Sequence, residues 1–167
     1  MSKERDSSPL NESFQFFCKN WSELNRDELH ALIRLRIDVF VVEQDCPYPD
    51  LDGKDLLSHH VYAIKKGDDV ASGVSASATI RICAPGVSYS EPSLGRVVTN
   101  SSCRGLGLGI YMMKRAINEC EHLYPGQGIR ISAQCYLDKF YTSLGFETTG
   151  ETYLEDDIPH IQMFRKS

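Results

Sequence analysis

The spacing of hydrophobic positions changes along the first third of the chain, and each change marks a new element. Residues 14–18 alternate between apolar and polar side chains, which predicts a β-strand. From Asn25 to Val41 the apolar residues recur every three or four positions, which predicts an amphipathic helix with Asn25 or Asp27 as its N-cap. The segment 44–55 contains two prolines and four aspartates, so we expect a loop there.

The middle of the chain predicts a β-hairpin followed by one further strand. Residues 60–65 and 70–83 are its expected arms, and residues 67–69 (Gly-Asp-Asp) are the turn. A loop is expected at 84–93, where prolines and glycine occur, and the short apolar segment 94–99 predicts the next strand.

The second half alternates between helical and extended patterns. A buried helix face runs from Gly107 to Leu123, and a Pro-Gly segment at 125–128 ends this helix. The remaining expected elements are a strand at 129–135, a short helix at 137–144 with Gly145 as its C-cap, and strands at 148–153 and 160–164. This order predicts one α/β domain on a mixed sheet at 12–167, after a leader at 1–11 that we expect to be flexible.

Composition and charge narrow the class of protein. A chain of 167 residues with 41% hydrophobic and 25% charged residues is typical of one globular domain. The net charge of -5 argues against a nucleic-acid-binding protein. No apolar segment reaches the roughly 18 residues of a membrane span, and we see no secretory signal, so we expect a cytoplasmic protein without membrane contact. The six cysteines are scattered, which favours free thiols and no metal site.

The most informative segment is the glycine-rich stretch Arg104–Gly109. Three glycines alternate where a helix begins, although each helical glycine costs about 1 kcal/mol relative to alanine. Glycines at a helix start leave backbone N–H groups accessible, and the helix dipole favours an anion there. The motif is neither a Rossmann fingerprint, because Ile110 replaces the third glycine, nor a Walker A loop. A structural turn that only allows close helix packing is the alternative.

The Arg-x-x-Gly-x-Gly pattern resembles the pyrophosphate loop of the Gcn5-related N-acetyltransferases, the GNAT superfamily. The segment Phe140–Phe146 looks like the Phe-Tyr and Gly-Phe helix end of that family, at the right distance downstream. Segments across most of the chain also resemble the ElaA-like branch: Leu35-Arg36, Val39–Gln44, Cys46–Tyr48, Asp50, Asp52-Gly53, His60, Glu155-Asp156 and Ile158–Ile161.

This resemblance implies a GNAT-type fold, with a mixed, mostly antiparallel sheet of six to seven strands flanked by about four helices. It also implies acetyl-CoA as the acyl donor and no metal. The residues implied to bind the donor are those of β-strand 94–99, the glycine loop and the end of the next strand: Val97, Val98, Thr99, Arg104, Gly105, Leu106, Gly107, Leu108, Gly109 and Gln134.

The implied reaction is a direct attack of an amine on the thioester. By resemblance, Tyr141 is the candidate general acid that protonates the departing thiolate. A phenol near pKa 10 is a weaker acid than a thiol near 8.5, so this transfer is uphill by about 2 kcal/mol unless it is concerted or the site lowers the Tyr141 pKa. The general base stays open among Glu43, His60 and His160.

The acceptor is expected to be a small-molecule amine. Arg36, Arg81 and His60 are expected to flank the acceptor cleft, and arginine suits phosphate, so a phosphorylated amino sugar such as glucosamine 6-phosphate would fit. An acidic stretch at 151–157 would instead suit a peptide lysine or a polyamine. A non-catalytic CoA-binding module is the alternative from another class. Edge strands near the C-terminus leave a homodimer open.

Overall fold

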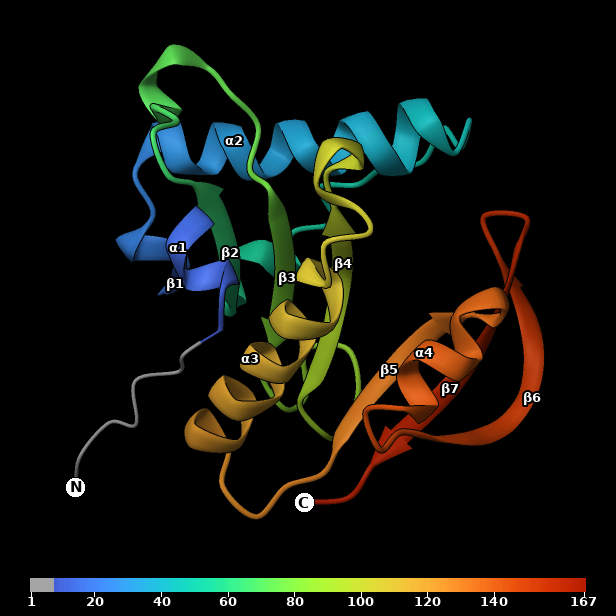
Figure 1. Ribbon diagram of the computed structural model, residues 1–167. Helices are drawn as coiled ribbons and strands as arrows, with labels where there is room; N and C mark the ends of the chain where they lie inside the picture. The colour runs from blue at the N-terminus through green and yellow to red at the C-terminus, as the bar shows by residue number, and fades with distance from the viewer. Residues whose placement is uncertain (1–7) are drawn as a thin grey trace.

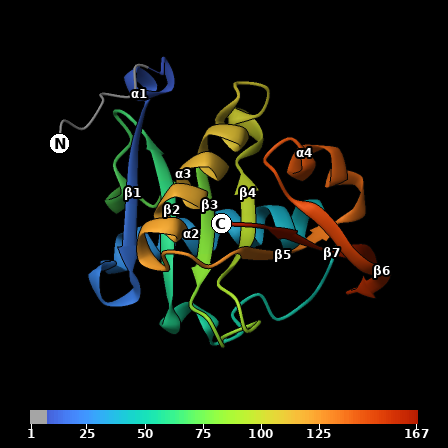
Figure 2. The same ribbon diagram turned by 90° about the horizontal axis from the view of Figure 1, so that it is seen from below.

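The protein is a seven-stranded mixed sheet with helices on both faces, and the computed structural model describes residues 8–167. The strands lie in the order β1-β2-β3-β4-β5-β7-β6, so that β1 and β6 are the edges (Figure 2). Every neighbouring pair is antiparallel except β4 and β5, which are parallel. The predicted α/β domain on a mostly antiparallel sheet is confirmed.

The elements follow one another along the chain as helices, strands and short turns. The strands are β1 (Phe14–Asn20), β2 (Ser58–Lys65), β3 (Ala78–Cys83), β4 (Ser93–Thr99), β5 (Ile129–Gln134), β6 (Glu147–Glu155) and β7 (Ile158–Arg165). The α-helices are α1 (Leu10–Ser13), α2 (Arg26–Arg36), α3 (Leu108–Leu123) and α4 (Asp138–Thr142). The remaining helical turns are η1 (Trp21–Glu23), η2 (Ile37–Glu43), η3 (Lys54–Leu57), η4 (Val70–Ser72), η5 (Ser101–Cys103) and η6 (Cys135–Leu137).

Two hydrophobic clusters cover the two faces of the sheet. The larger one packs the apolar stripe of α3, including Met113 and Ile117, against alternate residues of the central strands such as Ile80 and Ile131. The smaller one packs α2 against the opposite face around Tyr62. Because side chains of a strand alternate between faces, residues 79, 81 and 83 of β3 lie on the α2 side of the sheet.

Strands β4 and β5 separate soon after they meet, as Figure 1 shows. Their parallel pairing is limited to Ser93 and Arg130, near the start of both strands. Beyond this point the N–H and C=O groups on the β5 side of β4 have no partner in β5. Buried N–H and C=O groups are nearly always hydrogen-bonded, so another hydrogen-bonding partner is expected there. The divergence opens the sheet in its middle.

A β-bulge distorts β4 beside this opening. The register with β3 shifts between Thr79–Val98 and Arg81–Gly95, so β4 contains one extra residue there. Arg96 adopts a left-handed φ of 51° within the bulge. Such a conformation is unusual for a residue other than glycine, and it often occurs near functional sites.

Two sequence-based expectations need correction, and a third lies partly outside the described residues. The returning hairpin arm begins at Ala78 rather than at residue 70, because Val70–Ser72 form a short helical turn capped by Asp69. The first long helix changes to a π-helix, η2, from Ile37 onward. Of the expected leader, residues 1–7 lie outside the described part of the chain, while Asn11 of α1 accepts a 3.1 Å hydrogen bond from the Tyr111 hydroxyl.

Candidate active site

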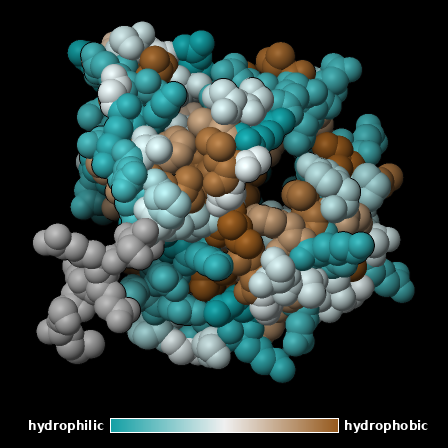
Figure 3. Space-filling model, in the orientation of Figure 1, coloured by the Kyte–Doolittle hydropathy of each residue, from teal (hydrophilic) through white to brown (hydrophobic). Residues whose placement is uncertain are grey.

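A cleft of about 790 Å³ occupies the opening between β4 and β5. Its walls come from η2 and the loop after it, from β3, β4 and β5, from α4, and from the turn between β6 and β7. In the space-filling view the α3 face is hollowed near its middle, and hydrophobic side chains gather along the margin (Figure 3). Because segments far apart in sequence meet here, we take this cleft as the candidate active site.

The glycine loop forms the tip of α3 at one end of the cleft. Gly105 and Gly107 have φ values of 78° and 79°, which L-residues with a side chain rarely adopt. The first hydrogen bond of the helix runs from the Tyr111 N–H to the Gly107 carbonyl at 3.2 Å, so the helix does not use the N–H groups that precede it. Leu108 is buried and anchors the tip, whereas Leu106 is exposed.

The space beside this tip depends on the third glycine. A Cβ atom at Gly109 would lie 3.5 Å from the hydroxyl oxygen of Thr99, at the end of β4. A side chain at this position would therefore occupy part of the space between the helix tip and β4, in ordinary van der Waals contact with Thr99. Free N–H groups, a helix dipole and an open passage together fit the diphosphate of a CoA donor.

Val97, Val98, Thr99 and Gln134 lie where the arm of such a donor would pass. All four line the cleft. Val97–Thr99 belong to the part of β4 that β5 does not pair with, so their backbone groups can bond an extended ligand. Gln134 ends β5, and its side-chain amide donates to Gln44 at 3.4 Å.

Arg104 is paired with Glu43 of η2. Its guanidinium donates to both carboxylate oxygens, at 2.7 and 2.9 Å. The hydrogen bond from Arg104 lowers the pKa of Glu43, and the charge of Arg104 adds to the effect. A carboxylate whose pKa is lowered is a weaker base, so the structure makes Glu43 a poor candidate for the general base.

Tyr141 lines the cleft from α4 and is held between two aromatic rings. Phe140 and Phe146 pack against it edge-on, with centroid distances of 5.1 and 6.1 Å. Burial raises the pKa of the Tyr141 phenol above its ordinary value. The site therefore does not lower this pKa, so proton donation by Tyr141 requires concerted cleavage of the C–S bond.

His160 lies on β7, opposite Gln134 of β5, and lines the same cleft. Its Nδ1 is 2.8 Å from the carbonyl oxygen of Ile158. Because a carbonyl can only accept, Nδ1 carries a proton in the neutral ring, and Nε2 is then the free basic atom. Tyr153 stacks against the imidazole and fixes its orientation. This arrangement suits a general base.

A polar cluster next to His160 was not predicted from the sequence. Ser132 bonds the Tyr153 hydroxyl and donates to Glu155 at 3.0 Å. Burial, with the nearby charges of Tyr153 and Glu155, raises the pKa of Tyr89 to about 12. Strand alternation places residues 132 and 134 on the same face, and this was the signal that could have revealed the cluster.

All three residues that were expected to bind a substrate phosphate already have bonding partners within the protein. Arg36 is only 3% exposed, and it bonds Asp50 at 2.8 Å and Asp55 at 2.7 Å. His60 is 1% exposed, with Nε2 at 3.2 Å from the Asp55 carbonyl oxygen, and burial lowers its pKa. Neither side chain lines the cleft, so the expectation that they flank it is corrected.

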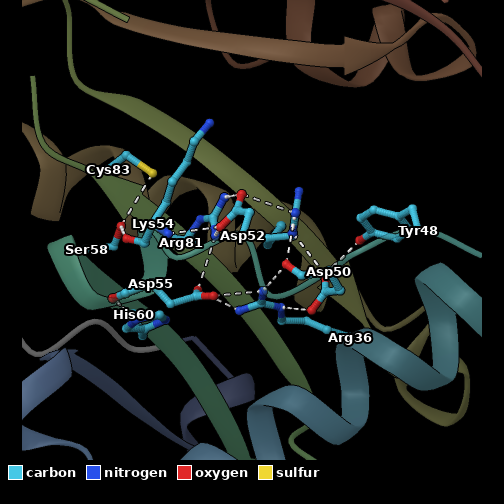
Figure 4. A network of polar contacts seen from close by, with 11 residues as sticks. Arg36, Tyr48, Asp50, Asp52, Lys54, Asp55, Ser58, His60, Arg81 and Cys83 are labelled. Carbon is cyan, nitrogen blue, oxygen red and sulfur yellow. Dashed lines mark hydrogen bonds and ion pairs between the residues drawn. The ribbon is translucent and has the colours of Figure 1, made fainter. Parts of the chain in front are cut away.

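Arg81 does line the cleft, but it also belongs to this buried network (Figure 4). It donates to Asp52 at 2.8 and 2.9 Å and to Asp55 at 3.3 Å. Arg96 bonds Asp50 and Asp52 beside it. Three arginines thus face three aspartates of the segment 50–55, and together they fasten this segment to the sheet. The four aspartates in the predicted loop were the available signal, but the sequence does not indicate which arginines they pair with.

The π-helix explains how one element reaches both the core and the cleft. Gln44 and Cys46 donate to carbonyls five residues earlier, at 3.0 and 3.1 Å. The wider turn shifts the helical phase, so that Phe40 and Glu43 line the cleft together with Val39, which is also buried against the core. An apolar pattern alone does not distinguish this from an α-helix.

Two further findings concern the described part of the chain, residues 8–167. No cluster of three or more His, Cys, Asp or Glu side chains is arranged there to hold a metal ion. None of its helices has the length and apolarity that crossing a bilayer requires.

Known proteins match both the sequence and the geometry. A family model described as an acetyltransferase (GNAT) domain matches residues 73–166. Protein ElaA of Escherichia coli is 38% identical over 147 residues, which cover 87% of this chain and 92% of that protein. A crystal structure of an acyl-CoA N-acyltransferase from Pseudomonas aeruginosa superposes with a TM-score of 0.83 at 41% identity, covering 92% of this chain and 99% of that one. The crystal structure of Escherichia coli ElaA has a TM-score of 0.82.

Proposed function

Because this chain belongs to the GNAT acetyltransferase family, in its ElaA-like branch, we propose that it transfers an acetyl group from acetyl-CoA to the primary amine of a small molecule. The observation that carries this proposal is the position of the glycine tip of α3 beside the gap between β4 and β5. An anion site and a row of unpaired backbone groups meet there in one cleft, together with Tyr141 and His160.

The donor would be held mainly by backbone groups. The N–H groups of Gly105–Gly109 would hold the diphosphate, Arg104 would add a charge, and the backbone of Val97–Thr99 would bond the extended arm. When bound, acetyl-CoA supplies the activated acyl group as a thioester. N–H groups of β4 near Val98 and Thr99 would stabilise negative charge that develops on the thioester oxygen.

The proposed reaction uses two proton-transfer groups of this chain. The amine nitrogen bonds to the acyl carbon, the bond from that carbon to sulfur breaks, one proton leaves the amine, and one proton reaches the sulfur. Nε2 of His160 accepts the amine proton, directly or through water, and the Tyr141 hydroxyl donates to the sulfur as the C–S bond breaks. Glu43 is left to position Arg104.

The acceptor lies on the α2 side of the opening, where His160, Ser132 and Tyr89 line the cleft. A phosphorylated amino sugar belongs to the chemical class that this space would take, although Arg36 and His60 are not its ligands. Lysine peptides and polyamines are the competing acceptors, since Glu155 and Asp156 also line the cleft.

The test is release of CoA from acetyl-CoA in the presence of an amine panel: glucosamine, glucosamine 6-phosphate, a lysine peptide and spermidine. Formation of an N-acetylated product, identified by mass spectrometry, supports the proposal. CoA binding without turnover on any amine would instead favour a non-catalytic module, and a preference for the peptide would contradict a small-molecule acceptor.

A further inference from the structure

The arginine side chains that line the cleft are all matched with carboxylates. Arg81 and Arg96 are bonded to Asp52, and Arg104 is bonded to Glu43. The two charges of an ion pair largely cancel, so such a pair attracts a charged ligand only weakly. The remaining charged groups of the cleft therefore decide which acceptor it prefers.

Lys54 is the exception among the cationic side chains that line the cleft. Its backbone is fixed: the N–H donates to Asp52 at 3.1 Å, and the carbonyl accepts from the Ser58 hydroxyl at 2.6 Å. Its side chain extends away from the aspartates, as Figure 4 shows. Within residues 8–167 the ammonium group has no carboxylate partner.

The polar network next to Lys54 also contains a hydrogen-bond donor without an acceptor in the described structure. Arg81 shares Asp52 with the Lys54 backbone, and its side chain is 95% buried. Its Nε–H has no hydrogen-bond acceptor in the described structure. The other neighbours in the network, Ser58 and Cys83, are buried and bond to each other at 3.4 Å. A buried donor without an acceptor is costly, so this end of the cleft favours a negatively charged group.

Another part of the cleft wall, formed by β5 and the β6–β7 hairpin, has acidic side chains. Glu155 accepts from Ser132 but has no cationic partner in the part of the chain that the structure describes, and Asp156 extends the acidic surface at the hairpin turn. His160 stands beside them on β7. A protonated amine would be attracted to this wall, which is where the proposed base can deprotonate it.

We infer that the acceptor is a small molecule with a primary amine at one end and an anionic group, carboxylate or phosphate, at the other, and that Lys54 binds the anionic group. This inference rests on the proposed function and adds the acceptor class to it. Lys54 acts as a specificity-determining residue, with Glu155 on the amine side. A charged hydrogen bond of this kind corresponds to a preference of about 10- to 100-fold for the anionic acceptor.

Matched acceptor pairs test the inference. One pair is glucosamine 6-phosphate with glucosamine, and the other is 4-aminobutyrate with its amide, so that the two arms separate phosphate from carboxylate. We expect kcat/KM to be higher for the anionic member of at least one pair in the wild-type protein. Lys54→Met should bring this ratio close to one, Lys54→Arg should preserve it, and Lys54→Glu should invert it.

The exposed Lys65 provides the matched control, because it lies at the end of β2 outside the cleft. Lys65→Met should keep the wild-type ratio. Equal rates for both members of each pair, or a ratio that survives Lys54→Met, would overturn the inference while leaving N-acetylation intact. Absence of both CoA binding and turnover would overturn the proposed function itself, and the inference with it.

Discussion

Arg104 and Glu43, 61 positions apart in the sequence, hold each other at two points across the cleft, with N–O distances of 2.7 and 2.9 Å. The contact joins the glycine loop to the π-helix, which are the cofactor side and the acceptor side of the proposed site. In the proposed complex, Arg104 would be shared between the Glu43 carboxylate and the diphosphate of the donor. Loss of the Arg104 charge should therefore lower the affinity for CoA, whereas loss of the Glu43 charge should raise it.

Arg104→Met should weaken CoA binding by roughly 10- to 100-fold, because a charged hydrogen-bond donor to the diphosphate is lost. Glu43→Gln removes the competing carboxylate, so CoA should bind roughly two- to fivefold more tightly, as expected for an exposed ion pair. Isothermal titration calorimetry at constant salt measures both. Weaker binding by Glu43→Gln would show that the pair supports the site instead of competing with the ligand.

Tyr141→Phe should lower kcat by about 100-fold, the ordinary contribution of a general acid. The phenyl ring keeps the packing against Phe140 and Phe146, so the fold and the CoA affinity should stay close to wild type. Steady-state kinetics together with a thermal melt separate the two effects. A kcat within twofold of wild type would remove Tyr141 from the mechanism.

His160→Gln should lower kcat/KM for the amine by about 100-fold near pH 7, because a lysine-like amine with pKa of about 10.4 is almost fully protonated there. The loss should shrink as pH rises toward the pKa of the amine, which then deprotonates without help. A pH–rate profile measures this. A deficit that stays constant with pH would point to a positioning role for His160.

Much of the fold followed from periodicity and turn residues, whereas the polar network did not. The strands near Phe14, His60 and Ile129 have local sequence signals. The glycines at 105 and 107 are themselves the signal for the positive φ angles found there. The pairing of Arg36 with Asp55 is not local, because two charges 19 positions apart become partners only when the sheet brings them together. The same holds for Arg104 and Glu43.

The general base illustrates the same limit. Glu43, His60 and His160 are equivalent in the sequence, since each has a suitable residue type. Burial makes His60 inaccessible to a substrate, and the ion pair with Arg104 lowers the pKa of Glu43 and so makes it a weaker base. The Ile158 carbonyl oxygen orients the His160 ring. These three environments depend on tertiary contacts, and no sequence motif in the chain predicts those contacts.

Asp55→Asn should lower the free energy of unfolding by about 3–5 kcal/mol, because it leaves the buried Arg36 and Arg81 without their shared carboxylate. Asp68, exposed in the β2–η4 turn, gives the matched control, and Asp68→Asn should change the free energy by less than about 0.5 kcal/mol. Urea denaturation measures both. A small effect of Asp55→Asn would mean that the network contributes little to stability.

Acid should loosen the same network. Burial, the largest single effect, would raise the pKa of Asp52, but the hydrogen bonds from Arg81 and the Lys54 N–H and the charges of Arg81 and Arg96 together outweigh it and lower this pKa to about 2. A lowered pKa in the folded state stabilises the fold at every pH above the unfolded value of about 3.9. Stability should therefore fall as pH drops from about 4 toward 2. Chemical denaturation across this pH range checks it, and a flat profile would contradict it.

The central claim is that backbone N–H groups at the tip of α3 hold the diphosphate of the donor. Titration of the ¹⁵N-labelled protein with CoA, followed by NMR, tests it directly, with pantetheine as the ligand that lacks the diphosphate. The account predicts saturable shifts of the amide signals of Gly105, Gly107 and Gly109 with CoA, and much smaller ones with pantetheine. Absence of CoA binding, or shifts that leave residues 104–109 unaffected, would contradict it.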